Sequence, residues 1–228
     1  MPSNTGLKPK VRARRKAERP AEILDAAFIE FAKEGYAATR LEDVAKRVGV
    51  TKGTIYFYFE TKERVFEEMI RHVARPVFSE LNDFATTLNG PYLGRLRALI
   101  GFLYNRIAKD RSSREVFRFL IAEGGRFPEL VDRHYEEFVR PFIDRLREVV
   151  TSGVAAGEFR TTAALEFSDI FMSPILMLNL WTLLSGDRRK IDLEAFIDAH
   201  FDLLMNGLSL PKPPRKIPNR RFESPTSS

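Results

Sequence analysis

Apolar side chains recur at the spacing of an α-helix from residue 20 to residue 207, and this periodicity limits the chain to a helical fold. In the segment PAEILDAAFIEFAKEG, Ile23, Ala27 and Phe31 follow one another every four residues and form one apolar stripe. Pro20 is typical of a first helical turn, and Gly35 is typical of a helix end. No segment shows convincing strand-like alternation, so we expect an all-α fold of about nine helices.

Two more short helices follow this first one. In TRLEDVAKRVG, Thr39 and Glu42 have the spacing of a capping box, and Gly49 stands where the helix should end. Thr51 then precedes KGTIYFYF as an N-cap residue. Composition alone would make this aromatic run a β-strand. The start and stop signals around it predict a short helix instead, so the three segments form a helix-turn-helix pattern.

Beyond residue 62 the predicted helices become longer and more apolar, which indicates a domain boundary near that point. Pro76 predicts a bend in the first of them, and Pro141 predicts a bend in the fourth. We expect these later helices at residues 62–88, 91–110, 113–123, 128–154, 163–185 and 193–207.

Several classes of function have no support in the sequence. Cysteine is absent, which excludes disulfides, thiolate metal sites and cysteine nucleophiles. We find no Gly-rich phosphate loop, GxSxG or HExxH motif, and the three histidines are too scattered for a local metal motif. We therefore expect no enzyme activity, no cofactor and no metal. The longest apolar-rich stretch, IFMSPILMLNLWTLL, is short and interrupted, so we expect a soluble cytoplasmic protein without a membrane span or signal peptide.

Positive charge is concentrated at the two ends of the chain. Residues 1–19 carry +6 and residues 210–228 carry +4, so the total of +6 leaves −4 for residues 20–209. The C-terminal segment is rich in Pro and Ser and has few apolar residues, which predicts disorder. We expect residues 1–19 to be a disordered basic arm as well. Such an arm is either simply solvated or a contact for a polyanion.

The aromatic helix has one inward and one outward face when successive residues are turned by about 100°. Ile55 and Phe59 fall together on the inward face. Exposed rings beside hydroxyl groups, an ammonium group and a glycine suit a DNA duplex, because they offer bonds to phosphates and contacts to thymine methyls. The alternative is that the rings pack on another helix. The outward face contains Gly53, Thr54, Phe57 and Tyr58, with Lys52 and Tyr56 on its flank.

The segment ATRLEDVAKRVGVTKGTIYFYFETKERVFEEM closely resembles the DNA-binding part of the TetR family of bacterial repressors. The resemblance is specific over about residues 20–70 and weaker beyond, apart from AEGGRFPEL at residues 122–130. It implies that Thr39 and Arg40 contact the DNA backbone and that Lys62 holds a phosphate. It also implies that Lys52, Gly53, Thr54, Tyr56, Phe57 and Tyr58 form the recognition surface. Tyr58 departs from the family, since many relatives have His there.

The resemblance also implies two more roles for the chain. The arm, with Arg12, Arg14, Arg15, Lys16 and Arg19, would reach phosphates or the minor groove. The last two helices, at about 163–185 and 193–207, would form a homodimer. A short recognition helix reads few base pairs, and a dimer reads two half-sites one helical turn apart. The alternative is that their apolar residues form intramolecular core. These residues are Phe167, Ile170, Phe171, Ile175, Leu176, Leu178, Trp181, Phe196, Phe201 and Leu204.

The expected domains are therefore the arm at 1–19, a helix-turn-helix DNA-binding domain at 20–66, a regulatory ligand-binding and dimerisation domain at 67–209 and a tail at 210–228. A small inducer of unknown identity would bind the second domain, at polar groups set among apolar ones. The candidates are Tyr104, Arg118, Glu123, His134, Tyr135, Asn179 and Trp181. Each of them could equally be an ordinary core or surface residue.

The sequence thus predicts a repressor that binds a palindromic operator as a homodimer and is released by a small molecule. Activation in place of repression stays open. Two alternatives lack operator binding, namely a helical module that docks a partner protein and a carrier of apolar ligands.

Overall fold

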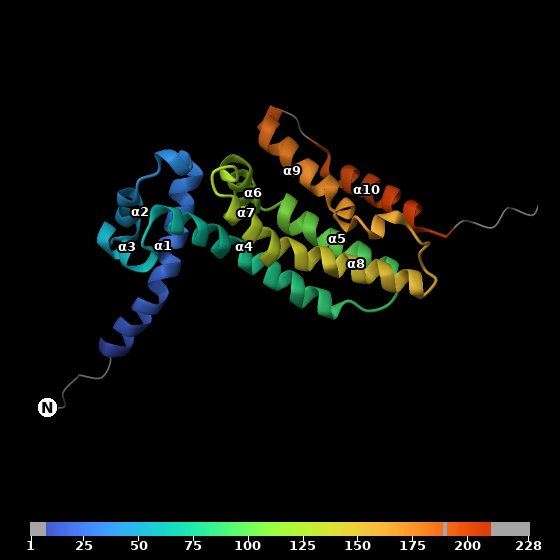
Figure 1. Ribbon diagram of the computed structural model, residues 1–228, viewed down its shortest axis with the longest axis horizontal. Helices are drawn as coiled ribbons and strands as arrows, with labels where there is room; N and C mark the ends of the chain where they lie inside the picture. Colours follow the sequence, from blue (N-terminus) through green and yellow to red (C-terminus); the bar gives the residue numbers. More distant parts are fainter. Residues whose placement is uncertain (1–7, 189–190, 211–228) are drawn as a thin grey trace, which may run out of the picture.

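The computed structural model in Figure 1 is an elongated, helical molecule with the N-terminal helices at one end and the longer helices at the other. It describes the backbone of residues 8–188 and 191–210, and the side chains of residues 17–186, 188 and 191–210. Within these residues there is no β-strand, only one isolated bridge between Phe159 and Ser209. The all-α prediction is confirmed.

The first helix is longer than expected. α1 covers Lys8–Ala38, so residues 8–19 are helical where we expected a disordered arm. The reason lies in their composition, because Lys, Arg, Ala and Glu are all strong helix formers. Residues 1–7 lie outside the described part, as do the side chains of the arm before Ala17. Gly35 has a φ of 78° inside α1, so the predicted end at this glycine is a break in the helix.

The next two helices form the expected turn, but one cap differs from the prediction. α2 covers Leu41–Val48 and α3 covers Lys52–Phe59. The predicted capping box is wrong, because Arg40 is the N-cap residue and Thr39 Oγ1 instead donates to the carbonyl of Gly35 at 2.7 Å. Thr51 caps α3 as expected by accepting a hydrogen bond from the amide of Thr54 at 3.2 Å. The aromatic run is therefore a helix.

The remaining helices follow the expected order, with two changes. Residues 128–155 form one continuous helical run in which a π-helical turn joins two α-helices. The last helix but one begins at Ser173 instead of residue 163, because Pro174 fits a first helical turn but lacks the N–H that a helix interior needs. The elements are α4 Lys62–Thr87, α5 Tyr92–Leu103, η1 Tyr104–Ala108, α6 Arg111–Glu123, α7 Pro128–His134, η2 Tyr135–Val139, α8 Arg140–Ala155, η3 Ala163–Leu165, η4 Ser168–Phe171, α9 Ser173–Ser185, η5 Gly186–Arg188 and α10 Leu193–Leu208.

Two apolar cores stabilise the described part of the chain, and their border does not follow the sequence. The second core lies among α5, α8, α9 and α10. The first core contains the inward faces of α1–α4, and it also takes Val116 and Phe119 from α6 and Leu130 from α7. We call this set the shared core, because two helices of the expected regulatory part complete it. Figure 1 shows α6 and α7 beside the junction of α1 and α4.

Candidate nucleic-acid interface and regulatory sites

The aromatic residues of α3 divide between core and solvent. Ile55 is fully buried and Phe59 nearly so, and both belong to the shared core. Phe57 lies outside it with 72% of its surface exposed. Tyr58 is only half-buried and packs against the shared core, so it does not face fully outward as expected. Apart from Tyr58, the predicted division of the rings is confirmed.

Gly53 leaves open space on the outer side of α3. A Cβ atom at this position would meet only Thr51 Oγ1, at the ordinary contact distance of 3.7 Å. The fold itself therefore does not require glycine here, although glycine in a helix costs about 1 kcal/mol relative to alanine. The absent side chain instead leaves the backbone open to close approach from outside.

The polar residues beside Gly53 hold one another in place. The ammonium of Lys52 lies 2.7 Å from a carboxylate oxygen of Glu42 in α2 and 5.4 Å from the ring centroid of Tyr56. The pKa of Glu42 is lowered, first by this hydrogen bond from Lys52. Thr54 lies with its hydroxyl oxygen 3.0 Å from that of Thr51. The outer surface of α3 is thus an aromatic patch with two hydroxyl groups and an ion pair at its edge.

The three other predicted DNA contacts differ in exposure. Arg40 is exposed, as expected. Thr39 is only 3% exposed and its hydroxyl already donates within α1, which disagrees with a contact to DNA by this side chain. The ammonium of Lys62 donates to the carbonyl of Ala37 at 3.2 Å and lies 4.7 Å from the ring centroid of Tyr36. Burial lowers the pKa of Lys62.

Tyr36 joins the DNA-binding helices to the regulatory helices, which the sequence did not reveal. Its hydroxyl donates to Glu63 in α4 at 2.8 Å, and its ring meets the edge of Phe127 at 5.0 Å between centroids. The guanidinium of Arg126 lies 4.9 Å from the same ring. The turn between α6 and α7 therefore holds the end of α1 against the start of α4. The segment AEGGRFPEL was the available signal, since it contains both Arg126 and Phe127.

The predicted ligand residues do not converge on one cavity. Asn179 and Tyr104 are buried, whereas Tyr135 and Trp181 are more than 40% exposed. Arg118 bonds Glu115 and the carbonyl of Ala32, so it joins α6 to α1. Glu123 is half-buried at the end of α6. Which of these residues contacts a ligand therefore stays a prediction, because helical periodicity gives the face of a residue but not its neighbours across the bundle.

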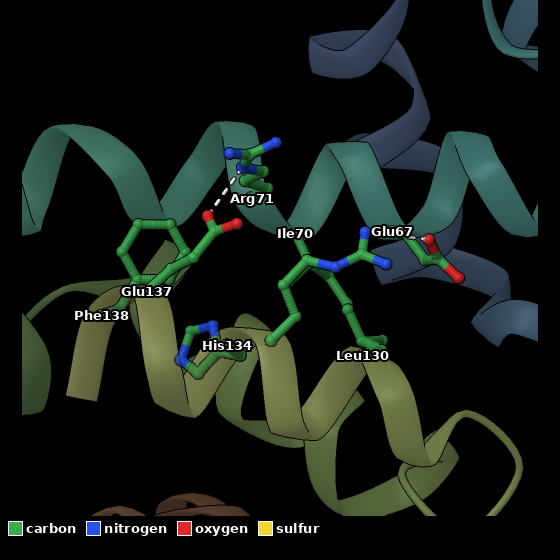
Figure 2. A pocket seen from close by; sticks show the side chains of 8 residues that line it. Glu67, Ile70, Arg71, Leu130, His134, Glu137 and Phe138 are labelled. Atoms are coloured by element: carbon green, nitrogen blue, oxygen red, sulfur yellow. Dashed lines mark hydrogen bonds and ion pairs between the residues drawn. The ribbon is translucent and has the colours of Figure 1, made fainter. Parts of the chain in front are cut away.

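His134 lies in a small cavity between α4 and the α7–η2 segment, which Figure 2 shows. Its Nδ1 atom is buried and has no hydrogen-bond partner among the described residues. Burial lowers the pKa of His134 to about 4. The cavity measures about 10 Å³, which is about the minimum for one water molecule. It is therefore too small for an inducer.

Two ion pairs span the same gap between helices. Arg71 of α4 lies 2.7 Å from Glu137, and the dashed line in Figure 2 marks this pair. Arg133 of α7 lies 3.4 Å from Glu67 of α4. Together with His134, these pairs form a contact between α4 and the regulatory helices.

The predicted dimer interface divides into buried and exposed residues. Phe171, Ile175, Leu178 and Phe201 are buried inside the chain's own second core, so they are not available to a partner. Phe196 and Leu204 are half-buried. The remaining apolar side chains leave α9, α10 and the turns before them with an uncovered apolar face. This face contains Phe167, Ile170, Leu176, Met177, Trp181, Leu184 and Leu203.

Membrane spans and metal sites have no candidate within the part of the chain that the structure describes. No helix there is long and apolar enough to cross a membrane. No cluster of His, Asp and Glu side chains there has a geometry suitable for a metal ion.

Comparison with known proteins identifies both halves of the chain. Residues 23–69 match the family model described as bacterial regulatory proteins, tetR family. Residues 96–192 match the model described as AefR-like transcriptional repressor, C-terminal domain. Together the two matches cover 144 of the 228 residues. Both models describe regulators of transcription, as the sequence led us to expect.

Individual proteins give the same result over most of the chain. The transcriptional repressor KstR2 of Rhodococcus jostii is 25% identical over 201 residues, which is 86% of this chain and 94% of KstR2. The crystal structure of a TetR-family regulator from Mesorhizobium loti superposes with a TM-score of 0.73, 23% identity and coverage of 86% and 99% of the two chains. The regulator FadR of Bacillus subtilis, solved with stearoyl-CoA, has a TM-score of 0.62, 21% identity and coverage of 82% and 98%.

Proposed function

Because this chain belongs to the TetR family of bacterial transcriptional repressors, we propose that it works as a cytoplasmic homodimer that leaves its operator when a small inducer binds. The operator would be palindromic, since a two-fold dimer places two recognition helices on two half-sites about one helical turn apart. The comparisons do not favour the two readings without operator binding.

The outer surface of α3 carries this proposal. Phe57 is 72% exposed beside Gly53, where the fold leaves room that no side chain of the protein fills. An exposed phenylalanine ring makes no favourable contact with water, whereas the major groove offers thymine methyl groups for apolar contact. We assign base contacts to Phe57 and Thr54, and close backbone approach to Gly53. Tyr58 is half-buried, so only the edge of its phenol ring would contact the DNA.

Phosphate contacts surround this surface in the proposal. Arg40 is exposed at the start of α2, and Lys52 and Tyr56 lie at the rim of α3. Lys62 stands at the first position of α4, where the helix N-terminus attracts anions. Its ammonium exchanges the carbonyl of Ala37 for a phosphate when DNA binds. Thr39 shapes the α1–α2 turn and makes no direct contact in the proposal, since its hydroxyl and its amide both donate to the carbonyl of Gly35.

The homodimer would form through the uncovered apolar face of α9 and α10. Leu203 is 74% exposed and Phe167 is 67% exposed, and several large apolar side chains exposed on neighbouring elements are typical of an interface. Figure 1 shows these helices along the edge of the molecule away from α3. The dimer therefore leaves both recognition helices free.

An inducer with an apolar chain is supported by the relative from Bacillus subtilis, whose structure contains stearoyl-CoA. An inducer releases DNA by binding the DNA-incompetent conformation more tightly than the DNA-bound one. The contact of α4 with α7, and the Tyr36 contact with the α6–α7 turn, would transmit the change to α3. Both join the regulatory helices to the DNA-binding helices.

Selection from random-sequence DNA tests the proposal. We expect the purified homodimer to enrich a palindrome and its affinity to fall steeply with salt, because phosphate contacts release counterions. Lys62→Ala should weaken binding to all sequences and reduce the salt slope by about one, whereas Phe57→Ala should also change sequence preference. Lys33→Ala, at an exposed lysine of α1, is the matched control and should change neither. A protein that enriches no sequence would refute the proposed function.

A further inference from the structure

A cavity of about 390 Å³ opens between α10 and the turns before α9, away from the residues that the sequence predicted for a ligand. Its walls are mostly apolar, and its size lies within the range of about 300–1,000 Å³ that small-molecule sites occupy. Leu204 and Leu208 of α10 form one wall, and Phe171 and Pro174 form the other. Ile170 and Leu203 line it as well, so the cavity adjoins the apolar face proposed for the homodimer. The polar groups at this cavity are few, and they determine what it can hold.

His200 is the buried polar group of the cavity. The residue is only 7% exposed, and its Nδ1 atom lies 2.8 Å from the hydroxyl of Tyr104, which is fully buried. Burial raises the pKa of Tyr104 to about 12, so the phenol keeps its proton. The phenol has no other hydrogen-bond partner among the described residues, so its O–H must donate to Nδ1 to be satisfied. The neutral imidazole then carries its proton on Nε2.

The Nε2–H group consequently lacks an acceptor. No described residue bonds Nε2, and His200 lines the cavity. Nε2 reaches solvent at the cavity, since it does not belong to the buried polar atoms that lack a partner. A ligand that displaces this solvent must therefore offer an acceptor oxygen in its place.

Arg160 supplies the charge at the same cavity. Its Nε donates to the carbonyl of Gly207 at 2.5 Å, and its amide donates to the carbonyl of Leu208 at 2.9 Å, so the end of α10 holds it in place. Its two terminal guanidinium nitrogens have no partner among the described residues. No aspartate or glutamate lines the cavity. The acceptor that fits a guanidinium and an N–H donor together is an oxyanion, and among oxyanions a carboxylate on an apolar chain suits the mostly apolar walls.

We propose that this cavity binds the inducer and that the inducer is an apolar carboxylic acid. Its hydrocarbon part lies against Leu204, Leu208 and Phe171, and its carboxylate accepts from His200 Nε2 and from the guanidinium of Arg160. This assignment rests on the proposed function, because it names the ligand that releases the operator.

The structure also connects the cavity to the DNA-binding helices. His200 bonds Tyr104, which begins the π-helical turn η1, and η1 contacts α6. α6 in turn contributes Phe119 to the shared core, where its ring meets Phe66 of α4. A carboxylate at His200 therefore acts on a continuous set of contacts that ends at α4.

Isothermal titration of the full-length homodimer with decanoate tests this proposal, with decan-1-ol and decylamine as probes of equal chain length. We expect one decanoate per subunit, binding by the alcohol that is about tenfold weaker or worse, and no binding of the amine. Decanoate should also lower the affinity for the selected operator in a fluorescence anisotropy assay. Equal binding of acid and alcohol, or an operator affinity that decanoate leaves unchanged, would overturn the proposal.

Three variants locate the site. His200→Asn keeps an amide near the position of Nδ1 for Tyr104 but removes the Nε2 donor, and Arg160→Gln removes the charge. Each should weaken decanoate binding about tenfold. Gly207→Phe should abolish it by filling the cavity, since a Cβ at Gly207 meets no atom within 4 Å and the fold tolerates a side chain. Arg145→Gln, on the exposed side of α8, is the control and should change nothing.

The outcomes separate this proposal from the function itself. Operator binding measured without decanoate tests the repressor, and all three variants should keep it. A wild-type protein that binds its operator but not decanoate leaves the repressor intact and refutes the acid site. Decanoate binding that His200→Asn and Arg160→Gln leave unchanged also refutes it. If Gly207→Phe instead dissociates the dimer, the cavity is a packing surface for the second copy and the proposal fails.

Discussion

Replacing Phe119 by alanine should destabilise the DNA-binding helices, although this residue belongs to the regulatory half of the sequence. Phe119 is 1% exposed, and its ring meets Phe66 of α4 edge-on with centroids 5.4 Å apart. Truncating a buried phenylalanine costs about 3–5 kcal/mol, including the cavity it leaves. A domain of this kind has about 5–15 kcal/mol in total, so the variant loses a large share. The loss should also appear in α2 and α3, because their buried residues belong to the same core as Phe119.

Hydrogen exchange measured by mass spectrometry resolves where the stability is lost. In Phe119→Ala the amides of α2 and α3 should exchange on the order of a hundredfold faster or more, because about 1.4 kcal/mol corresponds to each tenfold change. Fluorescence of Trp181, the single tryptophan, follows unfolding of the regulatory half in parallel. Phe57→Ala makes the same chemical change at an exposed ring and should leave exchange unaltered. If exchange in α2 and α3 stays at the wild-type rate in Phe119→Ala, the two halves do not share a core.

Three other outcomes follow from the structure. Gly53→Ala should raise the free energy of unfolding by about 0.5–1 kcal/mol in thermal melts. The same variant should weaken operator binding in an anisotropy assay. If both the stability and the operator affinity fall, the fold needs this glycine. Because His134 protonates at about pH 4 when folded and near pH 6.5 when unfolded, stability should fall by up to about 3 kcal/mol as the pH drops through this window. Urea unfolding should show that His134→Gln removes this part of the pH dependence, and an unchanged slope would contradict the assignment. Leu203→Asp should dissociate the homodimer in analytical ultracentrifugation, whereas Val131→Asp, at an exposed residue of α7, should not. Equal behaviour of the two variants would exclude the α9–α10 face as the dimer interface.

The sequence was sufficient for the elements whose signals are local. Thr51 and Gly49 mark the limits of α2 and α3, and the spacing of Ile55 and Phe59 gave the inward face of the aromatic helix. Local signals also misled where one side chain had two possible hydrogen-bond partners. Thr39 has the spacing of a capping residue, but in the fold its hydroxyl finds the carbonyl of Gly35 instead.

The candidate ligand residues show where local reasoning ends. Tyr104 was a reasonable candidate, yet it is separated from the cavity by His200, which lies 96 residues away in the sequence. In the sequence His200 is one of three scattered histidines, because periodicity places it on an apolar helix without saying what faces it. Arg160 lies in a turn with no motif of its own. Pairings between distant segments decide such sites, and one sequence does not contain them.

The shared core also has a consequence for how this protein can be recombined. Regulators are often treated as modules in which a recognition head is joined to a new sensor at the linker helix. Here a cut after residue 66 would remove Val116, Phe119 and Leu130 and leave an apolar hole beneath Phe66. A working chimera must therefore carry the α6–α7 region together with the head, or rebuild its three side chains in the new sensor. The unit that evolution or an engineer can exchange is discontinuous in the chain.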